Sequence, residues 1–178
     1  SPIVINLARY ITDVYDTRSD ITGFRFAGDE SSDEELWSVF QHNDGPLQAQ
    51  QANRESLALG RSYAIVGEGD DDIPLMTVES PFEAIHEDDP RTHEVKNGIK
   101  VWSELDKTKF VSLYHPYGRQ TWFRQKGEWK LDSEEENDYN LCRLVPLVND
   151  PRILGRYRRG KFDERLGRSV FHDAIPLM

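Results

Sequence analysis

Five histidines and one cysteine are the side chains of this 178-residue sequence best suited to metal binding or catalysis. The histidines are His42, His86, His93, His115 and His172. None of them forms the i, i+4 pair with a neighbouring glutamate that a helical zinc site uses. The single cysteine, Cys142, excludes an intrachain disulfide and a cysteine-based zinc site. The spacing of these residues therefore gives no positive evidence for a metal centre.

Two acidic stretches are candidate ligands for a hard cation. His86–Asp89 offers nitrogen and oxygen ligands, but its position between a strand and Pro90 favours an exposed loop. The run Asp70–Asp72 lacks the spaced ligands and the distal bidentate glutamate of a calcium loop, and it is typical of a solvated hairpin tip. We therefore expect no metal ion at either stretch.

The remaining patterns concern nucleotides and nucleophiles. Gly67-Glu68-Gly69 precedes three aspartates, which repel a phosphate, and no Gly-Lys-Ser/Thr ending follows it. Cys142 borders an apolar run, where a small buried thiol is the usual interpretation, and no Gly-x-Ser-x-Gly elbow is present. Trp122, Phe123 and Trp129 could stack on bases, but aromatic residues at strand spacing favour a core. We predict that the protein is not an enzyme and requires no cofactor.

Charge is distributed unevenly along the sequence, whose formal net charge is −10. Residues 1–151 contain 15 basic and 29 acidic residues, a net −14, whereas residues 152–178 contain seven basic and three acidic residues, a net +4. The acidic balance argues against a protein that grips nucleic acid over its whole surface. We predict that the basic segment is a subunit interface that meets an acidic surface, such as that of a neighbouring copy, with a solvated basic loop as the alternative. The candidate interface residues are Arg152, Arg156, Arg158, Arg159, Lys161, Arg165 and Arg168.

The N-terminal third of the sequence has mainly helical periodicity. Apolar spacing predicts an amphipathic helix over residues 3–17, and alternation predicts a short strand over residues 21–26. Ser32 and Glu35 form a capping box that predicts the start of a second helix. Its predicted apolar stripe is Leu36, Trp37 and Phe40. A third helix follows a proline-containing break and is predicted to end at Gly60.

After Gly60 the apolar period changes to two. Strands are predicted at residues 62–66 and 74–79, followed by a meander that includes residues 110–114, 120–124 and 128–131. A short apolar run, Leu144–Val148, precedes Asn149-Asp150-Pro151. The sequence therefore predicts an α+β fold, with N-terminal helices packed on a mostly antiparallel β-sheet over residues 62–148.

The residues at the two ends of the sequence also allow predictions. A final helix is predicted to begin at Ser169, and because it reaches Met178 without a C-terminal cap it is expected to be truncated. The initiator methionine is absent, so we expect a fragment of a longer protein. The longest apolar runs are far below the roughly 18 residues that span a bilayer, and the first residues lack signal-peptide features, so no membrane association is expected.

Three stretches together resemble the portal proteins of tailed bacteriophages and prophages. The first is the N-terminal helix with residues 21–26, and the second is Ala52–Val66, with its Gly-Arg-Ser-Tyr turn. The third runs from Leu144 through Asn149-Asp150-Pro151-Arg152 to Gly167-Arg168-Ser169. The sequence departs from the family pattern at Tyr157–Leu166, where a shorter loop is usual.

The resemblance implies a non-enzymatic ring, commonly of twelve copies, at one vertex of the capsid. Double-stranded DNA enters the capsid through such a ring during packaging and leaves through it during ejection, without sequence-specific binding. The implied partners are further copies of the chain, terminase, capsid or scaffold proteins and head–tail adaptor proteins. The implied location is the virion, with the bacterial cytoplasm during assembly or as a prophage product.

By the same resemblance, residues 1–151 would form the peripheral α+β wing domain, and residues 152–178 a basic segment leading into the start of a stem helix. The alternative from another class is a stand-alone acidic α+β protein-interaction module. An acidic-site hydrolase is a more distant alternative.

Overall fold

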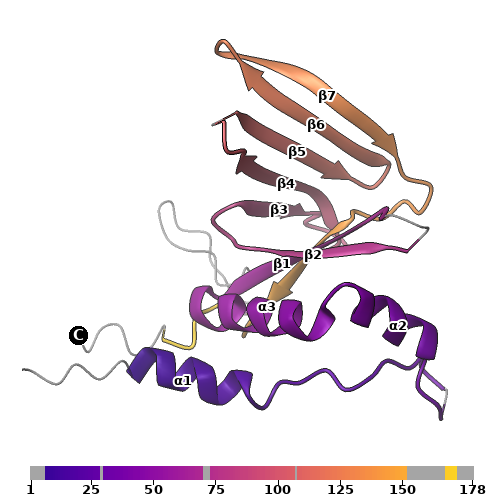
Figure 1. Ribbon diagram of the computed structural model, residues 1–178, viewed down its shortest axis with the longest axis vertical. Coiled ribbons are helices and arrows are strands. Elements are labelled where there is room, and N and C mark those ends of the chain that lie inside the picture. Colours follow the sequence, from indigo (N-terminus) through magenta and orange to yellow (C-terminus); the bar gives the residue numbers. More distant parts are fainter. Residues whose placement is uncertain (1–6, 29, 70–72, 107, 152–166, 172–178) are drawn as a thin grey trace, which may run out of the picture.

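The computed structural model describes residues 7–28, 30–69, 73–106, 108–151 and 167–171. Its elements form three successive layers: helices, a three-stranded sheet and a five-stranded sheet (Figure 1). All strand pairs are antiparallel. The predicted α+β class, with helices that precede an antiparallel sheet region, is confirmed. The division of the strands between two sheets was not evident from the alternation of apolar residues.

The helical layer contains α1 (Leu7–Asp16), α2 (Glu34–His42) and α3 (Gly45–Leu59). Helix α1 lies against α3, where Arg54 Nε donates to the buried carboxylate of Asp16 over 2.9 Å. Helix α3 ends where predicted, because Gly60 adopts φ 90°, a left-handed conformation that favours glycine.

The start of α2 differs from the predicted capping box. Asp33, and not Ser32, is the N-cap residue, since its side chain accepts a hydrogen bond of 2.8 Å from the backbone N–H of Leu36. An aspartate satisfies the first-turn N–H groups as well as a serine does, so the two neighbouring residues compete for this role. Phe40 is buried as predicted, whereas Leu36 is exposed.

The predicted strand over residues 21–26 is wrong. This segment contains no strand, and its alternating aromatic residues have different surroundings. The Phe24 ring packs edge-to-face on Phe40, with ring centroids 5.2 Å apart, and the Phe24 carbonyl accepts a bond of 2.7 Å from the Asp33 N–H. Phe26 is exposed. Phe24 therefore packs the segment before α2 against that helix, and the alternating residues do not form a strand.

The three-stranded sheet has the order β2–β1–β8, with β1 (Arg61–Gly67) between β2 (Leu75–Glu79) and β8 (Leu144–Val148). The β1–β2 hairpin is the predicted one. Strand β8 pairs with β1 from Arg61↔Val148 to Ile65↔Leu144. The sheet therefore joins residues from both ends of the strand region.

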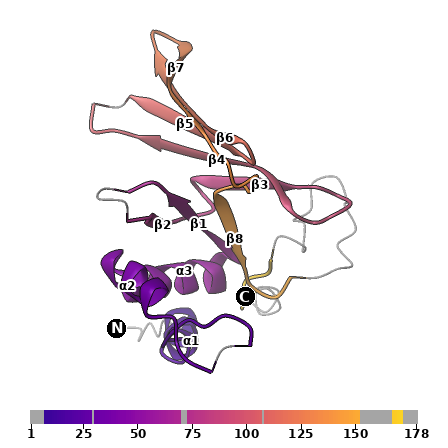
Figure 2. The same ribbon diagram turned by 90° about the vertical axis from the view of Figure 1, so that its right-hand side faces the viewer.

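The five-stranded sheet is a meander in chain order. It consists of β3 (Ala84–Asp88), β4 (Val95–Ser103), β5 (Lys109–His115), β6 (Gly118–Gln125) and β7 (Glu128–Glu136). The last three contain the strands predicted by alternation. Strand β3 replaces the exposed loop expected at His86–Asp89, so that expectation is wrong. Figure 2 shows this sheet crossing above the three-stranded sheet.

The principal core lies where the two sheets meet. Its buried members are Tyr63, Ile65, Ala84, Tyr114 and Leu144. Gly98 on β4 permits this contact, because a Cβ atom added there would lie 2.9 Å from the Leu144 side chain. On the opposite face of β1, the buried Ser62 hydroxyl donates to the Ala52 carbonyl of α3 over 2.9 Å. Strand β1 therefore connects all three layers.

Candidate interaction surfaces

His86 is a buried link between the two sheets. Its side chain is 2% exposed, its Nδ1 lies 3.1 Å from the Tyr63 hydroxyl, and its Nε2 lies 3.3 Å from a carboxylate oxygen of Asp88. Burial lowers the pKa of His86, and Arg61 acts in the same direction, whereas Asp88 opposes this shift. These contacts are typical of a structural histidine. Among the described residues, no group of three or more His, Cys, Asp or Glu could hold a metal ion.

Cys142 is only half-buried, so the predicted buried thiol is confirmed in part. It is partly buried against the core between the sheets, and burial raises the pKa of its thiol. A raised pKa leaves little thiolate at neutral pH, so this position has no feature of a catalytic nucleophile. Within the described residues, no helix is long and apolar enough to cross a lipid bilayer.

The aromatic residues proposed for the core have different environments. Phe123 is half-buried and lies 6.2 Å from Phe110, whose ring stacks on Trp102 with centroids 5.3 Å apart. Trp122 is also half-buried. Trp129 is 46% exposed on the edge strand β7, so the expected core position is wrong for this residue.

The second and third of the stretches that carried the family resemblance meet at one junction. The Asn149 N–H donates to the Gly60 carbonyl over 2.9 Å, which joins the end of β8 to the start of β1. The Val170 N–H donates to the Leu57 carbonyl of α3 over 2.9 Å. Gly167 approaches Gly60 so closely that a Cβ atom on Gly60 would lie 2.9 Å from the Gly167 backbone. The glycines in both motifs are therefore required by close backbone contact.

Arg168 is the member of the predicted basic interface that lies within the described residues. Its side chain is 11% exposed and its Nη1 lies 3.8 Å from Asp150 in the same chain. The other six predicted interface residues, residues 152–165, lie outside the described residues. The helix predicted from Ser169 falls largely outside them as well. Within them, the Ser169 hydroxyl accepts a bond of 3.1 Å from the Phe171 N–H.

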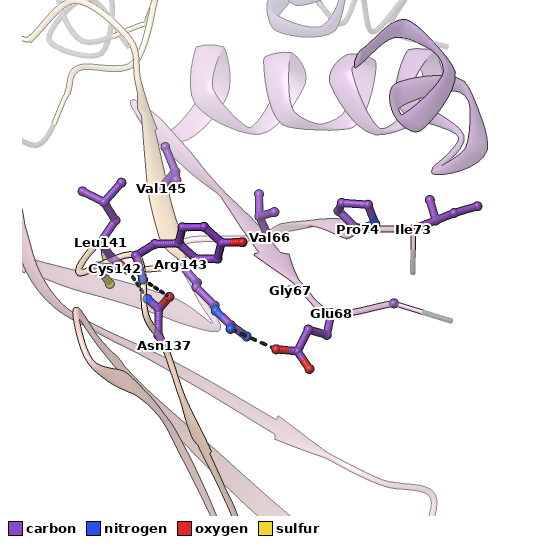
Figure 3. Close-up of a pocket in the computed structure, with 12 residues that line it drawn as sticks. Val66, Gly67, Glu68, Ile73, Pro74, Asn137, Leu141, Cys142, Arg143 and Val145 are labelled. Carbon is purple, nitrogen blue, oxygen red and sulfur yellow. Dashed lines mark hydrogen bonds and ion pairs between the residues drawn. The ribbon is translucent and has the colours of Figure 1, made fainter. Parts of the chain in front are cut away.

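An open pocket of about 590 Å³ lies at the edge of the three-stranded sheet. The end of β1 and the segment between β7 and β8 supply most of its walls. The apolar lining residues are Val66, Ile73, Pro74, Leu141, Cys142 and Val145, together with Tyr139. Figure 3 shows Val66 and Val145 pointing toward the helices. The lining is thus mainly apolar, with Glu68, Asn137 and Arg143 as its polar side chains.

Polar contacts fix the walls of this pocket. Arg143, just before β8, is 15% exposed and pairs with Glu68 over 3.2 Å (Figure 3). It also pairs with Glu135 of β7 over 3.5 Å, which ties the segment before β8 to the five-stranded sheet. The buried Asn137 side chain donates to the carbonyls of Pro116 and Leu141 over 3.0 and 2.6 Å. The pocket wall is therefore held in place before anything occupies the pocket.

A second apolar surface is the outer face of the five-stranded sheet. Cross-strand pairing places Ile85 beside Ile99, and Trp122 between Val111 and Leu131. The exposed members of this face are Ile85, Ile99, Val101, Trp129 and Leu131, which are 37–53% exposed. The face of an antiparallel sheet that is exposed to water is usually polar, whereas this face is rich in exposed apolar side chains.

Sequence reasoning missed the pocket and the exposed Phe82, which is 84% exposed in the turn between β2 and β3. The pocket combines residues near position 67 with residues near position 140, and no local pattern reveals that juxtaposition. For Phe82 a local signal exists, because Ser-Pro-Phe-Glu after a strand predicts a turn with an aromatic residue on it.

Comparison with known proteins gives consistent results. The family model described as phage portal protein, SPP1 Gp6-like, matches residues 1–178. The chain is 28% identical to the portal protein of Mycobacterium phage L5 over 163 residues, which is 86% of this chain and 34% of that relative. It is 29% identical to the portal protein of Mycobacterium phage D29 over 163 residues, with the same coverage. The chain therefore spans about a third of the length of these curated relatives. Because the family model matches the chain from end to end, the chain belongs to the SPP1 Gp6-like phage portal protein family.

Proposed function

We propose that this chain is part of the subunit of a phage portal ring, the conduit for double-stranded DNA at a capsid vertex during packaging and ejection. The observation that carries the proposal is the match of the portal family model over residues 1–178. In this role the chain is a structural, non-enzymatic component of the virion that needs no cofactor. It is present in the bacterial cytoplasm during assembly or as a prophage product.

The net charge of the chain supports a role as a conduit for DNA and not as a clamp that binds DNA tightly. Each phosphate that a protein neutralises adds salt-dependent affinity for DNA, and tight binding would stall translocation. A net charge of −10 opposes such binding. DNA is therefore cargo that passes without sequence-specific contacts, while terminase, capsid or scaffold, and head–tail adaptor proteins are the expected protein partners.

The basic segment remains our candidate for part of the contact between ring subunits. A closed ring needs two different, complementary surfaces on every subunit. Residues 152–165 have a net positive charge and residues 1–151 a net charge of −14, so the two parts of the sequence have opposite sign. Arg168 has another role within this proposal, because its contact with Asp150 anchors the C-terminal end of the segment to its own chain.

The decisive experiment is a mass measurement by light scattering on the complete polypeptide that contains this sequence, with electron microscopy of the same sample. We expect closed rings of about twelve subunits. We expect the 178-residue piece alone to be mostly monomeric at micromolar concentration, because stem and crown regions supply much of the buried area in such rings. A complete polypeptide that stays monomeric at every salt concentration would contradict the proposal.

Charge reversal tests the basic segment separately. The triple variant Arg156→Glu, Arg158→Glu and Arg159→Glu should weaken ring assembly, chiefly at low ionic strength, since exposed ion pairs are screened by salt. The matched control reverses Arg18, Arg25 and Arg91, which are exposed elsewhere on the domain. Equal assembly of both triple variants would remove the basic segment from the interface and leave the ring proposal intact.

A further inference from the structure

The outer edge of β2 is blocked by side chains from the helical layer. The Met76 N–H donates to the Asn43 side-chain oxygen over 2.8 Å, and the Met76 carbonyl accepts a bond of 2.7 Å from the Gln48 side chain. The Asn43 amide also donates to the Pro74 carbonyl over 2.8 Å. These contacts use the backbone groups that a further strand would need, so β2 does not offer a free edge.

The outer edge of β8 is blocked in another way. The Arg143 carbonyl accepts a bond from the Val66 N–H, and the Asn149 N–H donates to the Gly60 carbonyl. Because hydrogen-bonded positions alternate along an antiparallel pair, every second residue from 143 to 149 faces β1. Pro146 lies between these positions and faces the outer edge, where it has no N–H to donate. Both edges of the three-stranded sheet are therefore unsuited to a further strand.

The five-stranded sheet ends in β3 on one side and β7 on the other (Figure 1). Strand β3 has five residues and a register shift against β4 between Glu87 and Asp88. Strand β7 has nine residues, and its register with β6 is regular between Ser133 and Glu136. Short and irregular edge strands are poor templates for pairing, whereas a longer regular stretch accepts another strand. Within the described residues, β7 thus offers the longest edge.

Two residues of β7 present their backbone groups to this edge. The Asn137 N–H donates to the Tyr117 carbonyl over 2.8 Å, which continues the β6–β7 ladder by one pair. Because such pairs alternate, the backbone groups of Glu134 and Glu136 face away from β6. The side chains of both residues are exposed, whereas that of Glu135 between them is half-buried. Glu134 and Glu136 therefore place two carboxylates on one face of an open strand edge.

This part of β7 has little compensating positive charge. Residues 128–138 contain six acidic side chains and one basic side chain. Glu135 pairs with Arg119 and Arg143, whereas Glu134 and Glu136 form no ion pair with any described residue. A second β7 strand at this edge would bring like charges together, which destabilises a strand pair. The edge therefore fits a basic strand and not another copy of β7.

The acidic residues at β3 already have partners in their own chain. The Asp88 carboxylate lies 3.3 Å from His86 Nε2. The Asp89 carboxylate accepts bonds of 2.7 and 3.2 Å from the backbone N–H groups of Arg91 and Thr92, which fixes the turn after β3. These carboxylates have local structural roles, so β3 is a weaker acceptor for a basic segment than β7 is.

The basic segment contains cations at the spacing of these two glutamates. Arg156 and Arg158 are two residues apart, as Glu134 and Glu136 are. These arginines lie outside the described residues, so their spacing is taken from the sequence. In an extended strand, side chains two residues apart lie on the same face. Opposite charges directly across a strand pair are stabilising, so a strand with Arg156 and Arg158 beside β7 can form two favourable pairs.

We propose that residues 155–159 of one subunit add as a strand to the free edge of β7 in the next subunit, with Arg156 and Arg158 beside Glu134 and Glu136. The inference rests on the proposed portal function, and it names the acidic surface that the basic segment meets. The contact joins two different surfaces of the same chain, as a closed ring requires.

Charge reversal on each side tests the contact in the complete polypeptide. The β7 variant carries Glu134→Arg and Glu136→Arg, and the segment variant carries Arg156→Glu and Arg158→Glu. Each variant places like charges in contact, so each should raise the protein concentration for half-maximal ring assembly about tenfold at low ionic strength. The matched control carries Glu94→Arg and Glu104→Arg, which change the charge equally at exposed positions elsewhere, and it should assemble normally.

Mixing the two variants distinguishes a contact between subunits from a contact within one chain. In a ring of alternating subunits, every unchanged segment meets an unchanged β7, and every reversed segment meets a reversed β7. The equimolar mixture should therefore assemble at nearly the concentration that the unsubstituted polypeptide needs. A contact within one chain would be restored only when both reversals are in the same polypeptide, and that result would overturn the inference.

Hydrogen exchange tests the added strand itself. The N–H groups of Glu134 and Glu136 should exchange at least tenfold more slowly in assembled rings than in the unassembled segment variant, because the added strand accepts bonds from them. The N–H of the fully exposed Leu105 is the control and should exchange equally in both samples. Restored assembly without slower exchange at these two glutamates would indicate a contact between side chains alone and would overturn the added strand.

The two proposals fail in distinguishable ways. Normal ring assembly by the β7 variant would overturn the contact at β7 while leaving the portal function in place. If the segment variant alone were impaired, the basic segment would meet a different acidic surface. Failure of the unsubstituted polypeptide to form any ring would overturn both proposals.

Discussion

Asn149 and Arg168, which are 19 residues apart in the sequence, hold each other by two reciprocal hydrogen bonds. The Asn149 side-chain amide donates to the Arg168 carbonyl over 2.7 Å, and the Arg168 N–H donates to the Asn149 carbonyl over 2.8 Å. These two hydrogen bonds hold Asn149, which precedes the basic segment, beside Arg168, which ends it, next to Gly60. The Asn-Asp-Pro-Arg and Gly-Arg-Ser motifs are thus two sides of one structural joint.

Replacing the side chain of Asn149 should loosen this joint. Asn149→Ala leaves the Arg168 carbonyl without its side-chain donor, and we expect the free energy of unfolding to fall by about 1–2 kcal/mol. Urea denaturation followed by tryptophan fluorescence measures the change. The control is Asn97→Ala, whose side chain makes an exposed contact with Glu87 and should alter stability by less than about 0.5 kcal/mol. Equal effects of the two substitutions would contradict the structural role of the joint.

The close approach of β4 to β8 predicts intolerance at Gly98. Gly98→Ala places a methyl group 2.9 Å from the Leu144 side chain, so overpacking should cost about 1–3 kcal/mol. Gly67→Ala is the matched control, since a Cβ atom there has no neighbour within 4 Å. Thermal melts of both variants measure the difference. A neutral Gly98→Ala variant would mean that the two sheets meet less closely.

The cap of α2 discriminates between two neighbouring residues. Asp33→Ala removes the acceptor of the Leu36 N–H and should cost about 1 kcal/mol, whereas Ser32→Ala should be close to neutral. The comparison requires only the melting temperatures of the two variants. The reverse order would restore the capping box that the sequence alone predicts.

Stability should fall on acidification because of His86. Burial lowers the pKa of this side chain below its ordinary value of 6.5, so the unfolded chain binds a proton more readily than the folded chain. The contribution is fully present above pH 6.5 and is lost as the pH falls below that value toward the lowered pKa. Urea denaturation at pH 7.5, 6.5 and 5.5 measures it.

His86→Gln provides the control for this pH dependence, because glutamine cannot titrate. We expect the variant to be less stable at pH 7.5 but to lose less stability between pH 7.5 and 5.5 than the unsubstituted chain. The groups that face His86 are Tyr63, Asp88 and Arg61, and they are unchanged in this variant. Parallel pH profiles of the two proteins would assign the acid sensitivity to other groups.

Local patterns predicted much of the fold. Gly60 marks both the end of α3 and the change to alternating strands, because a helix stop and a two-residue period are properties of adjacent residues. The strand at His86 was missed since His-Glu-Asp is polar, although its histidine faces a buried tyrosine on another sheet. The strand expected at Phe24 was wrong because the same alternation serves a contact with α2.

The candidate surfaces were less accessible to sequence reasoning. The basic segment is visible in the sequence because its charged residues are close together along the chain. The family resemblance of the motifs around Asn149 and Arg168 is visible in the sequence as well. The pocket depends on long-range pairing that places Val66 near Val145, and such pairing leaves no signal in one sequence. Exposure of Phe82 likewise follows from the position of its turn on the finished sheet.

The place of β1 in the three-stranded sheet has a consequence for biosynthesis. Strands β3 to β6 each pair with the next strand along the chain, so the meander can close on short-range contacts as it leaves the ribosome. Strand β1 lacks its second partner until Val148 has been made, because Arg61 pairs with Val148. During that interval its free edge can accept a strand from another nascent chain. Completion of this sheet by β8 is therefore the step at which correct folding competes with strand exchange between copies.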